Sequence, residues 1–149
     1  MLAVVQRVSS ACCIVGEEIV GRIGKGMVVL LAVGRNDGLD QVRWMAKKIA
    51  NLRIFEDKNG KMNLSLLQIR GEILLVPQFT LYGDCSKGYR PSFTEAAPPE
   101  MAEKLFLQVK KCLLDFKIKI ISGIFGARMK IKLTNEGPVT LIVSSKNEK

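Results

Sequence analysis

The chain has 149 residues, of which 48% are hydrophobic and 25% are charged; this balance excludes an intrinsically disordered protein and is enough for one folded core. Lys and Arg total 23 against 14 Asp and Glu, so the net charge is +9, which favours an anionic partner such as nucleic acid. Histidine is absent, which excludes Ser-His-Asp triads, Cys-His pairs and histidine-ligated metal sites.

Composition also limits the compartment and the cofactors that we expect. No apolar run reaches the roughly 20 residues that a membrane helix requires, and Met1 leads directly into a strand-like segment rather than a signal peptide. The four cysteines form no C-x-x-C pair, so we expect reduced thiols rather than a disulfide framework or a zinc site. We therefore expect a cytoplasmic protein that uses no metal and no cofactor and has no contact with a membrane.

The N-terminal part of the chain predicts three strands followed by a helix. Residues 1–10 and 13–20 have strand-like patterns, and residues 27–33 form a continuous apolar run typical of a strand buried on both faces. In residues 39–52, apolar side chains recur at positions i, i+3, i+4 and i+7, which predicts an amphipathic helix.

The middle of the chain predicts a second buried strand, a long loop and a second helix. The strand covers residues 73–76, and residues 83–97 are rich in Gly, Pro and Ser, which is typical of a long functional loop. Pro98 and Pro99 are suited to the start of the second helix, because proline is tolerated in a first turn.

The C-terminal part predicts strands that carry cations on one face. Residues 117–120 and 128–133 alternate basic with aliphatic side chains, so each strand would direct its cations outward. Residues 139–143 form the last predicted strand, and residues 146–149 are expected to be a frayed tail.

Together these patterns give roughly seven strands and two helices that do not alternate regularly, which disfavours a doubly wound sheet. We predict one α+β domain over residues 1–145: a mostly antiparallel curved sheet or barrel with two main helices packed on it.

Two short segments depart from their surroundings. Pro77 and Gln78 directly follow a buried strand and end its pairing, which would free the backbone N–H groups of Phe79 and Thr80 to stabilise an oxyanion; an ordinary strand bulge explains the same pattern. The step from Gly137 to Pro138 is either a simple turn or a cis peptide whose carbonyl groups line a pocket.

Six segments in the same order and spacing make the chain resemble the D-aminoacyl-tRNA deacylase family, also called the D-tyrosyl-tRNA deacylases. The resemblance covers essentially the whole chain. The segments are Ala3-Val4-Val5-Gln6-Arg7-Val8, Asn51-Leu52-Arg53-Ile54-Phe55, Gln78-Phe79-Thr80-Leu81, Gly88-Tyr89-Arg90-Pro91-Ser92-Phe93, Gly123-Ile124-Phe125-Gly126 and Asn135-Glu136-Gly137-Pro138-Val139-Thr140.

The resemblance implies an activity and an assembly. The activity is hydrolysis of the ester that links a D-amino acid, or glycine on a non-cognate tRNA, to the 3′-terminal adenosine of tRNA. The assembly is a homodimer with active sites at the subunit interface. The implied reaction uses the 2′-hydroxyl of the terminal ribose rather than a protein nucleophile.

The resemblance also implies roles for individual residues. Gly137 and Pro138 match the family's Gly-cisPro motif, which enters the site of the other subunit, captures the amino group of a D-residue and excludes an L side chain. Arg7 matches an arginine that holds this motif in place. The catalytic segment around the scissile ester corresponds to Gln78, Phe79 and Thr80, and Phe125 and Met129 are the expected pocket residues. Pro77 stands where the family usually has serine, and we interpret this position as tolerant.

The sequence is compatible with two other classes of function. The basic faces are equally typical of an RNA-binding module without catalysis. A hydrolase with Thr80 as its nucleophile is a third hypothesis, although a threonine without an adjacent base is a weak nucleophile.

Overall fold

The computed structural model describes residues 1–145, which contain eight strands, three α-helices and one 3₁₀ helix. The predicted frayed tail at residues 146–149 lies outside the described residues. The strands are β1 (Leu2–Val15), β2 (Glu18–Ile23), β3 (Gly26–Ala32), β4 (Arg53–Glu56), β5 (Met62–Ser65), β6 (Glu72–Pro77), β7 (Lys119–Ser122) and β8 (Met129–Ser144). The helices are α1 (Leu39–Asn51), α2 (Leu66–Ile69), α3 (Pro99–Asp115) and the 3₁₀ helix η1 (Phe79–Tyr82).

Six of these strands form one strongly curved sheet, in the order β2-β1-β3-β6-β7 with β8 also paired to β1. β1 is antiparallel to β2, β3 and β8, whereas β6 is parallel to β3 and β7. β4 and β5 form a separate antiparallel pair. The predicted α+β fold with a mostly antiparallel, barrel-like sheet is confirmed. The parallel ladders were not predicted, and they arise because α1 and α3 provide the crossover connections that parallel neighbours need.

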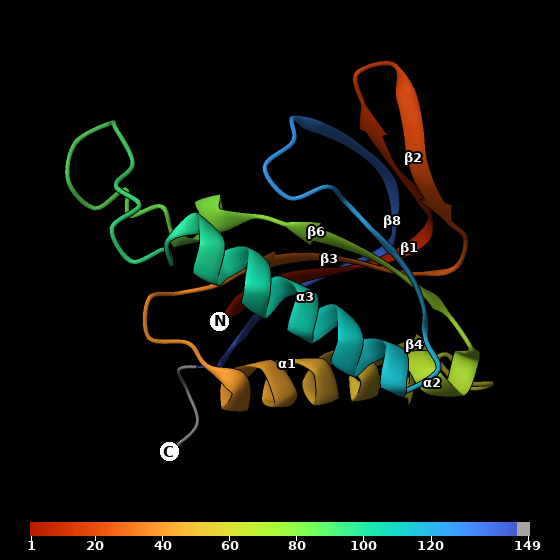
Figure 1. Ribbon diagram of the computed structural model, residues 1–149. Coiled ribbons are helices and arrows are strands. Elements are labelled where there is room, and N and C mark those ends of the chain that lie inside the picture. The colour runs from red at the N-terminus through yellow and green to blue at the C-terminus, as the bar shows by residue number, and fades with distance from the viewer. Residues whose placement is uncertain (146–149) are drawn as a thin grey trace.

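The central strands are buried on both faces, as the continuous apolar run of β3 predicts. On one face, side chains such as Val29 and Leu75 pack against α1 and α3, which lie together on the same side of the sheet (Figure 1). On the other face, Val28, Leu74 and Val76 pack inside the curl formed by β1, β2 and β8. The curved sheet therefore has a core on each side.

The first main helix follows the predicted apolar spacing, and the second has a buried stripe of its own. α1 buries Val42, Met45, Ala46 and Ile49, and α3 buries an equivalent stripe that includes Phe106. No helix within residues 1–145 combines the length and the apolar character needed to cross a membrane.

Two boundaries differ from the sequence prediction because residues with positive φ end an element. β1 continues to Val15, which pairs with Glu18, so that Gly16 (φ 62°) and the next residue form a two-residue turn. Lys117 also has a positive φ, of 62°, just after α3, so β7 begins only at Lys119.

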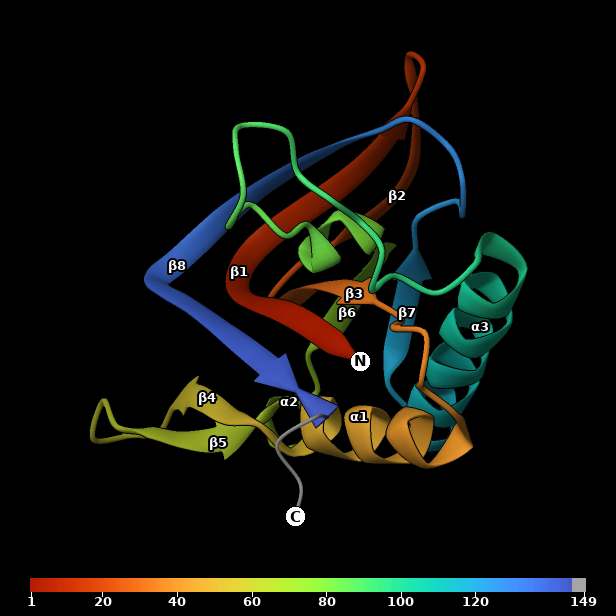
Figure 2. The same cartoon turned by 90° about the vertical axis from the view of Figure 1, so that its left-hand side faces the viewer.

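β8 is one long bent strand rather than two separate strands. In its ladder with β1, Gln6 pairs with Thr140 and Val8 pairs with Asn135, so that residues 136–139 all lie opposite Arg7. Figure 2 shows the sharp bend near the middle of β8, on the side of the molecule away from α3. The Gly-Pro segment is thus a bulge that interrupts the ladder between β1 and β8.

The close approach of β3 to β6 provides a test of this fold. A Cβ atom on Gly26 would lie 1.9 Å from the backbone oxygen of Glu72, whereas a Cβ atom on Gly24 would meet only the Glu72 carboxylate, at 3.9 Å. We predict that Gly26→Ala lowers the free energy of unfolding by at least about 2 kcal/mol, because the backbone must move. Urea denaturation measures the change. Gly24→Ala is the matched control and should stay within about 0.5 kcal/mol of the parent; equal effects of the two substitutions would contradict the strand register.

Candidate active site

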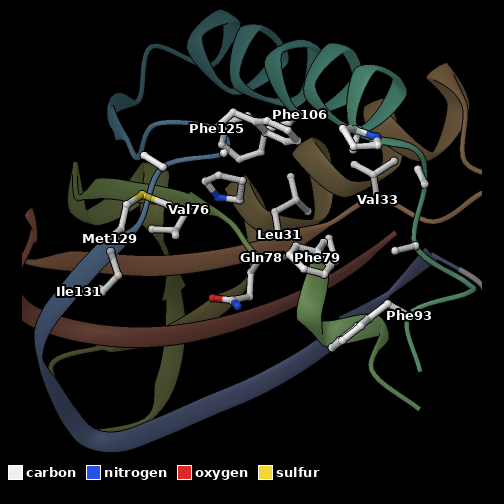
Figure 3. Close-up of a pocket in the computed structure, with 18 residues that line it drawn as sticks. Leu31, Val33, Val76, Gln78, Phe79, Phe93, Phe106, Phe125, Met129 and Ile131 are labelled. Carbon is white, nitrogen blue, oxygen red and sulfur yellow. The ribbon is translucent and has the colours of Figure 1, made fainter. Parts of the chain in front are cut away.

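A pocket of about 590 Å³ lies where β3 and β6 end, between η1, α3 and the start of β8. Figure 3 shows side chains from these elements converging on it. Its walls are apolar, with Leu31, Val33, Val76 and Phe106 among them. Of the described residues that line it, Gln78 is the only one whose side chain carries an amide, a hydroxyl or a charge. The pocket therefore suits a flat or apolar group held by few polar contacts.

The predicted catalytic segment lies at the edge of this pocket. Pro77 ends β6, and the N–H of Gln78 donates to the carbonyl oxygen of Leu31 at 2.8 Å before the chain turns into η1. Phe79 and Thr80 are the first two residues of η1, so their N–H groups have no acceptor inside the helix. This arrangement can stabilise negative charge on a carbonyl oxygen placed beside them.

The side chains of this segment are not equivalent. Gln78 and Phe79 line the pocket, whereas Thr80 is exposed and is not among the lining residues. The amide Nε2 of Gln78 donates a hydrogen bond to Oγ1 of Thr80. The Thr80 hydroxyl therefore interacts with the segment itself rather than with the interior of the pocket.

Two aromatic rings form the mouth of the pocket. Phe79 is 56% exposed, and its ring meets that of Phe93 in an edge-on contact with centroids 5.2 Å apart. Both rings line the pocket, so the long loop after η1 contributes to the wall. The sequence includes Phe93 in a family segment, but nothing in its pattern indicated a contact with Phe79.

The predicted pocket residues lie on the opposite wall. Phe125 and Met129 both line the pocket, and the ring of Phe125 lies 6.3 Å from that of Phe106 on α3. Phe106 belongs to the buried stripe of α3, and its side chain also bounds this cavity.

Tyr82, at the end of η1, does not supply a base. Burial, followed by the nearby carboxylates of Asp37 and Glu95, raises the pKa of its phenol well above the usual value. The phenol therefore stays neutral. Within residues 1–145, no group of three or more Cys, Asp or Glu side chains is placed to bind a metal ion.

Arg7 is a buried cation that joins three segments. It is only 6% exposed, and its Nε donates to the carbonyl oxygen of Glu136 at 2.9 Å. Its Nη1 donates to the carbonyl oxygen of Ile54 at 2.8 Å, and its Nη2 lies 3.4 Å from the carboxylate of Glu56. The guanidinium therefore fixes the bulge of β8 against β4.

The bulge is also braced from within. The peptide bond between Gly137 and Pro138 is cis. The side-chain oxygen of Asn135 accepts a hydrogen bond from the N–H of Val139 at 2.9 Å, and its Nδ2 donates to Oγ1 of Thr140 at 2.8 Å. One side chain thus spans the Gly-Pro step and holds both of its ends.

The structure separates the predicted site residues into two groups. Gln78, Phe79, Phe125 and Met129 line the pocket, and Thr80 follows at its edge. Arg7, Gly137 and Pro138 form the second group, which is not part of the pocket lining, and Gly137 and Pro138 are exposed. One copy of the chain does not bring the two groups together.

Comparisons with known proteins identify the family and the fold of the chain. The family described as D-Tyr-tRNA(Tyr) deacylase matches residues 4–144. The chain is 58% identical to a D-aminoacyl-tRNA deacylase of Desulfatibacillum aliphaticivorans, over 98% of this chain and 100% of that protein. A solved structure titled c-Myc DNA Unwinding Element Binding Protein superposes with a TM-score of 0.92 at 40% identity, covering 97% of this chain and 99% of that one. A probable eukaryotic D-amino acid tRNA deacylase shares the fold, with a TM-score of 0.83 at 20% identity over 95% of this chain and 97% of that one.

The contacts of Arg7 lead to a prediction about stability. We expect Arg7→Met to lower the free energy of unfolding by at least about 2 kcal/mol, because it leaves the buried carbonyl group of Ile54 and the partly buried carbonyl group of Glu136 without their donor. Urea denaturation is the measurement, with Glu56→Gln as the matched control. Glu56 is 56% exposed in its ion pair, so the control should change stability by less than about 1 kcal/mol. The same small change in both variants would contradict the anchoring role of Arg7.

Proposed function

The chain belongs to the D-Tyr-tRNA(Tyr) deacylase family, and we propose that two protomers complete each of its active sites. The protein is a D-aminoacyl-tRNA deacylase, a hydrolase that cleaves the ester between a D-amino acid and tRNA. In the proposed site, the pocket of one protomer binds the terminal adenosine with its ester, and Gly137 and Pro138 of the partner subunit cover it.

One observation carries this proposal: the Gly-Pro segment is firmly anchored, yet it is exposed and does not line the pocket of its own chain. Arg7 and Asn135 hold it with hydrogen bonds of 2.8–2.9 Å. A main-chain segment braced in this way is suited to insertion into another molecule, because little conformational freedom is lost on binding.

The proposed chemistry needs few protein groups. Water adds to the ester carbonyl carbon, and the bond from that carbon to the ribose oxygen then breaks, releasing the D-amino acid and the tRNA. The N–H groups of Phe79 and Thr80 stabilise the oxyanion that forms in between, and Gln78 orients the ester. Since the described pocket lining holds no ionisable side chain, we assign the proton transfer to the neighbouring 2′-hydroxyl of the substrate ribose.

The proposed selection between mirror images is steric. The carbonyl groups of the inserted Gly-Pro segment accept hydrogen bonds from the α-ammonium group of the substrate. The same wall occupies the space that an L side chain would need, whereas a D side chain points elsewhere. Glycine has no side chain to exclude, so glycine on a non-cognate tRNA is also proposed as a substrate.

The face around the bulge fits the proposed homodimer contact. Ile142 is 79% exposed and Leu141 is also exposed, and both follow the Gly-Pro segment in β8. Apolar side chains on a strand with an open edge are typical of an interface. Burying this face would place each bulge beside another copy of the chain.

The exposed lysines of β8 are suited to contact the tRNA. Lys130 and Lys132 are exposed while their neighbours in β8 are half-buried, and such a ladder suits sequence-independent contacts with phosphates. We propose that residues 1–145 act as one domain and that the protein works in the cytoplasm.

Gly137 provides the main test of selection. It has a φ of +125°, and a Cβ atom would lie 2.7 Å from Nη2 of Arg7 and 3.0 Å from Cγ2 of Val139. We predict that the parent protein hydrolyses D-tyrosyl-tRNA without added metal and spares the L-ester, and that Gly137→Ala reduces D-ester hydrolysis about 10²-fold because the segment shifts. Release of radiolabelled tyrosine measures both rates.

Gly60→Ala is the matched control for Gly137→Ala. Gly60 also has a positive φ, of +73°, but nothing lies within 4 Å of its Cβ position, so the control has the same kind of backbone strain far from the site. It should retain parental hydrolysis of the D-ester. Equal hydrolysis of both esters by the parent protein would refute the selection mechanism.

Thr80 distinguishes this mechanism from a threonine nucleophile. Thr80→Val keeps the backbone N–H and removes the hydroxyl, so we predict hydrolysis of D-tyrosyl-tRNA within about threefold of the parent rate. Mass spectrometry of the quenched reaction checks for a covalent adduct. A loss of about 10⁴-fold together with an adduct on Thr80 in the parent protein would support the nucleophile instead. Binding of tRNA without any turnover would favour the RNA-binding module.

A further inference from the structure

The loop that follows η1 forms an exposed arm, residues 84–92, beside the mouth of the pocket. The N–H of Asp84 donates to the carbonyl oxygen of Ser92 at 2.7 Å, and the N–H of Ser92 donates back at 2.9 Å. These two bonds close the base of the arm. Figure 1 shows this part of the chain projecting from the body of the molecule.

The base of the arm is fixed to the active site. The N–H of Gly83 donates to the carbonyl oxygen of Thr80 at 2.9 Å, and the ring of Phe93 packs edge-on against Phe79. Figure 3 shows Phe79 and Phe93 next to each other beside Gln78. The arm therefore leaves the body directly beside the groups that are proposed to hold the ester.

The tip of the arm combines an aromatic ring with two cations. Tyr89 is fully exposed. Lys87 lies two residues before it and Arg90 directly after it, and both are exposed. Across residues 1–145, neither cation takes part in an ion pair or a side-chain hydrogen bond. The acidic residue at the base, Asp84, already accepts a hydrogen bond from the N–H of Ser86 at 2.9 Å. The tip thus has positive charge available to a partner.

We infer that this arm binds the unpaired nucleotides that precede the terminal adenosine of the substrate tRNA. The inference rests on the proposed function, because an aminoacyl-adenosine in the pocket requires the rest of the strand to leave past the mouth. Exposed aromatic rings stack on unpaired bases, and neighbouring cations bind the phosphates of a single strand. The assigned contacts are a base on Tyr89 and phosphates on Lys87 and Arg90.

The test compares two substrates that differ only in these nucleotides: D-tyrosyl-tRNA and D-tyrosyl-adenosine. Tyr89→Ala should raise KM for the tRNA substrate about tenfold with little change in kcat, and it should leave hydrolysis of D-tyrosyl-adenosine unchanged. Tyr89→Phe, which keeps the ring, should retain the parental KM.

The cations are tested through the salt dependence of kcat/KM. Lys87→Ala/Arg90→Ala should make the slope of log kcat/KM against log salt shallower by about 1.4 for the tRNA substrate, as expected for two lost phosphate contacts on a single strand. Lys58→Ala/Lys61→Ala removes the same charge from the exposed turn between β4 and β5 and should have a much smaller effect on this slope.

Other outcomes would overturn the inference in distinguishable ways. Equal losses on both substrates would mean that the arm only supports the pocket. A changed sedimentation coefficient in the arm variants would mean that the arm contacts a second copy of the chain. If all arm variants hydrolysed D-tyrosyl-tRNA with the kinetics of the parent protein, the arm would not bind these nucleotides. Failure of the parent protein on both substrates would contradict the proposed function itself.

Discussion

The geometry of this protein depends on one buried cation. The guanidinium of Arg7 donates to carbonyl groups from two distant parts of the chain, Glu136 in β8 and Ile54 in β4. A buried charge is tolerated only when its donors are satisfied, so the segments that supply those acceptors are held in place with it. The consequence is a braced bulge at Gly137 and Pro138 that is exposed and does not line the pocket of its own chain.

The pocket, unlike the charged anchor at Arg7, has apolar walls and, among the described residues that line it, a single amide side chain, that of Gln78. Such a site gives little general acid or base catalysis, but it can position a reactive ester and exclude water that is not needed. An aminoacyl ester is already activated, and its ribose carries a free hydroxyl on the carbon next to the one that bears the ester. A chain without histidine is thus chemically adequate for this reaction, provided that the backbone N–H groups at the start of η1 lie next to the carbonyl oxygen.

Much of the fold could be predicted from the sequence, because periodicity is a local property. The spacing of Val42, Met45 and Ile49 gave α1, and the apolar run of β3 gave a strand buried on both faces. The parallel pairing of β6 could not be predicted, since the crossovers depend on contacts far apart in the chain. The candidate site residues were found through short segments that resemble a family. The contact of Arg7 with Ile54 and that of Phe93 with Phe79 could not be predicted, because each joins residues far apart in the chain and a local pattern carries no information on such pairs.

The central claim is that the Gly-Pro segment of one protomer works in the pocket of another, and mixing of subunits tests it most directly. Gly137→Ala disables the segment, and Ala127→Trp fills the pocket, which Ala127 lines. Each variant alone should be nearly inactive on D-tyrosyl-tRNA. After the two are unfolded and refolded together in equal amounts, a site shared between protomers should recover about a quarter of the parental activity, because half of the random dimers carry one intact site. No recovery, in a mixture shown to contain mixed dimers, would contradict the account.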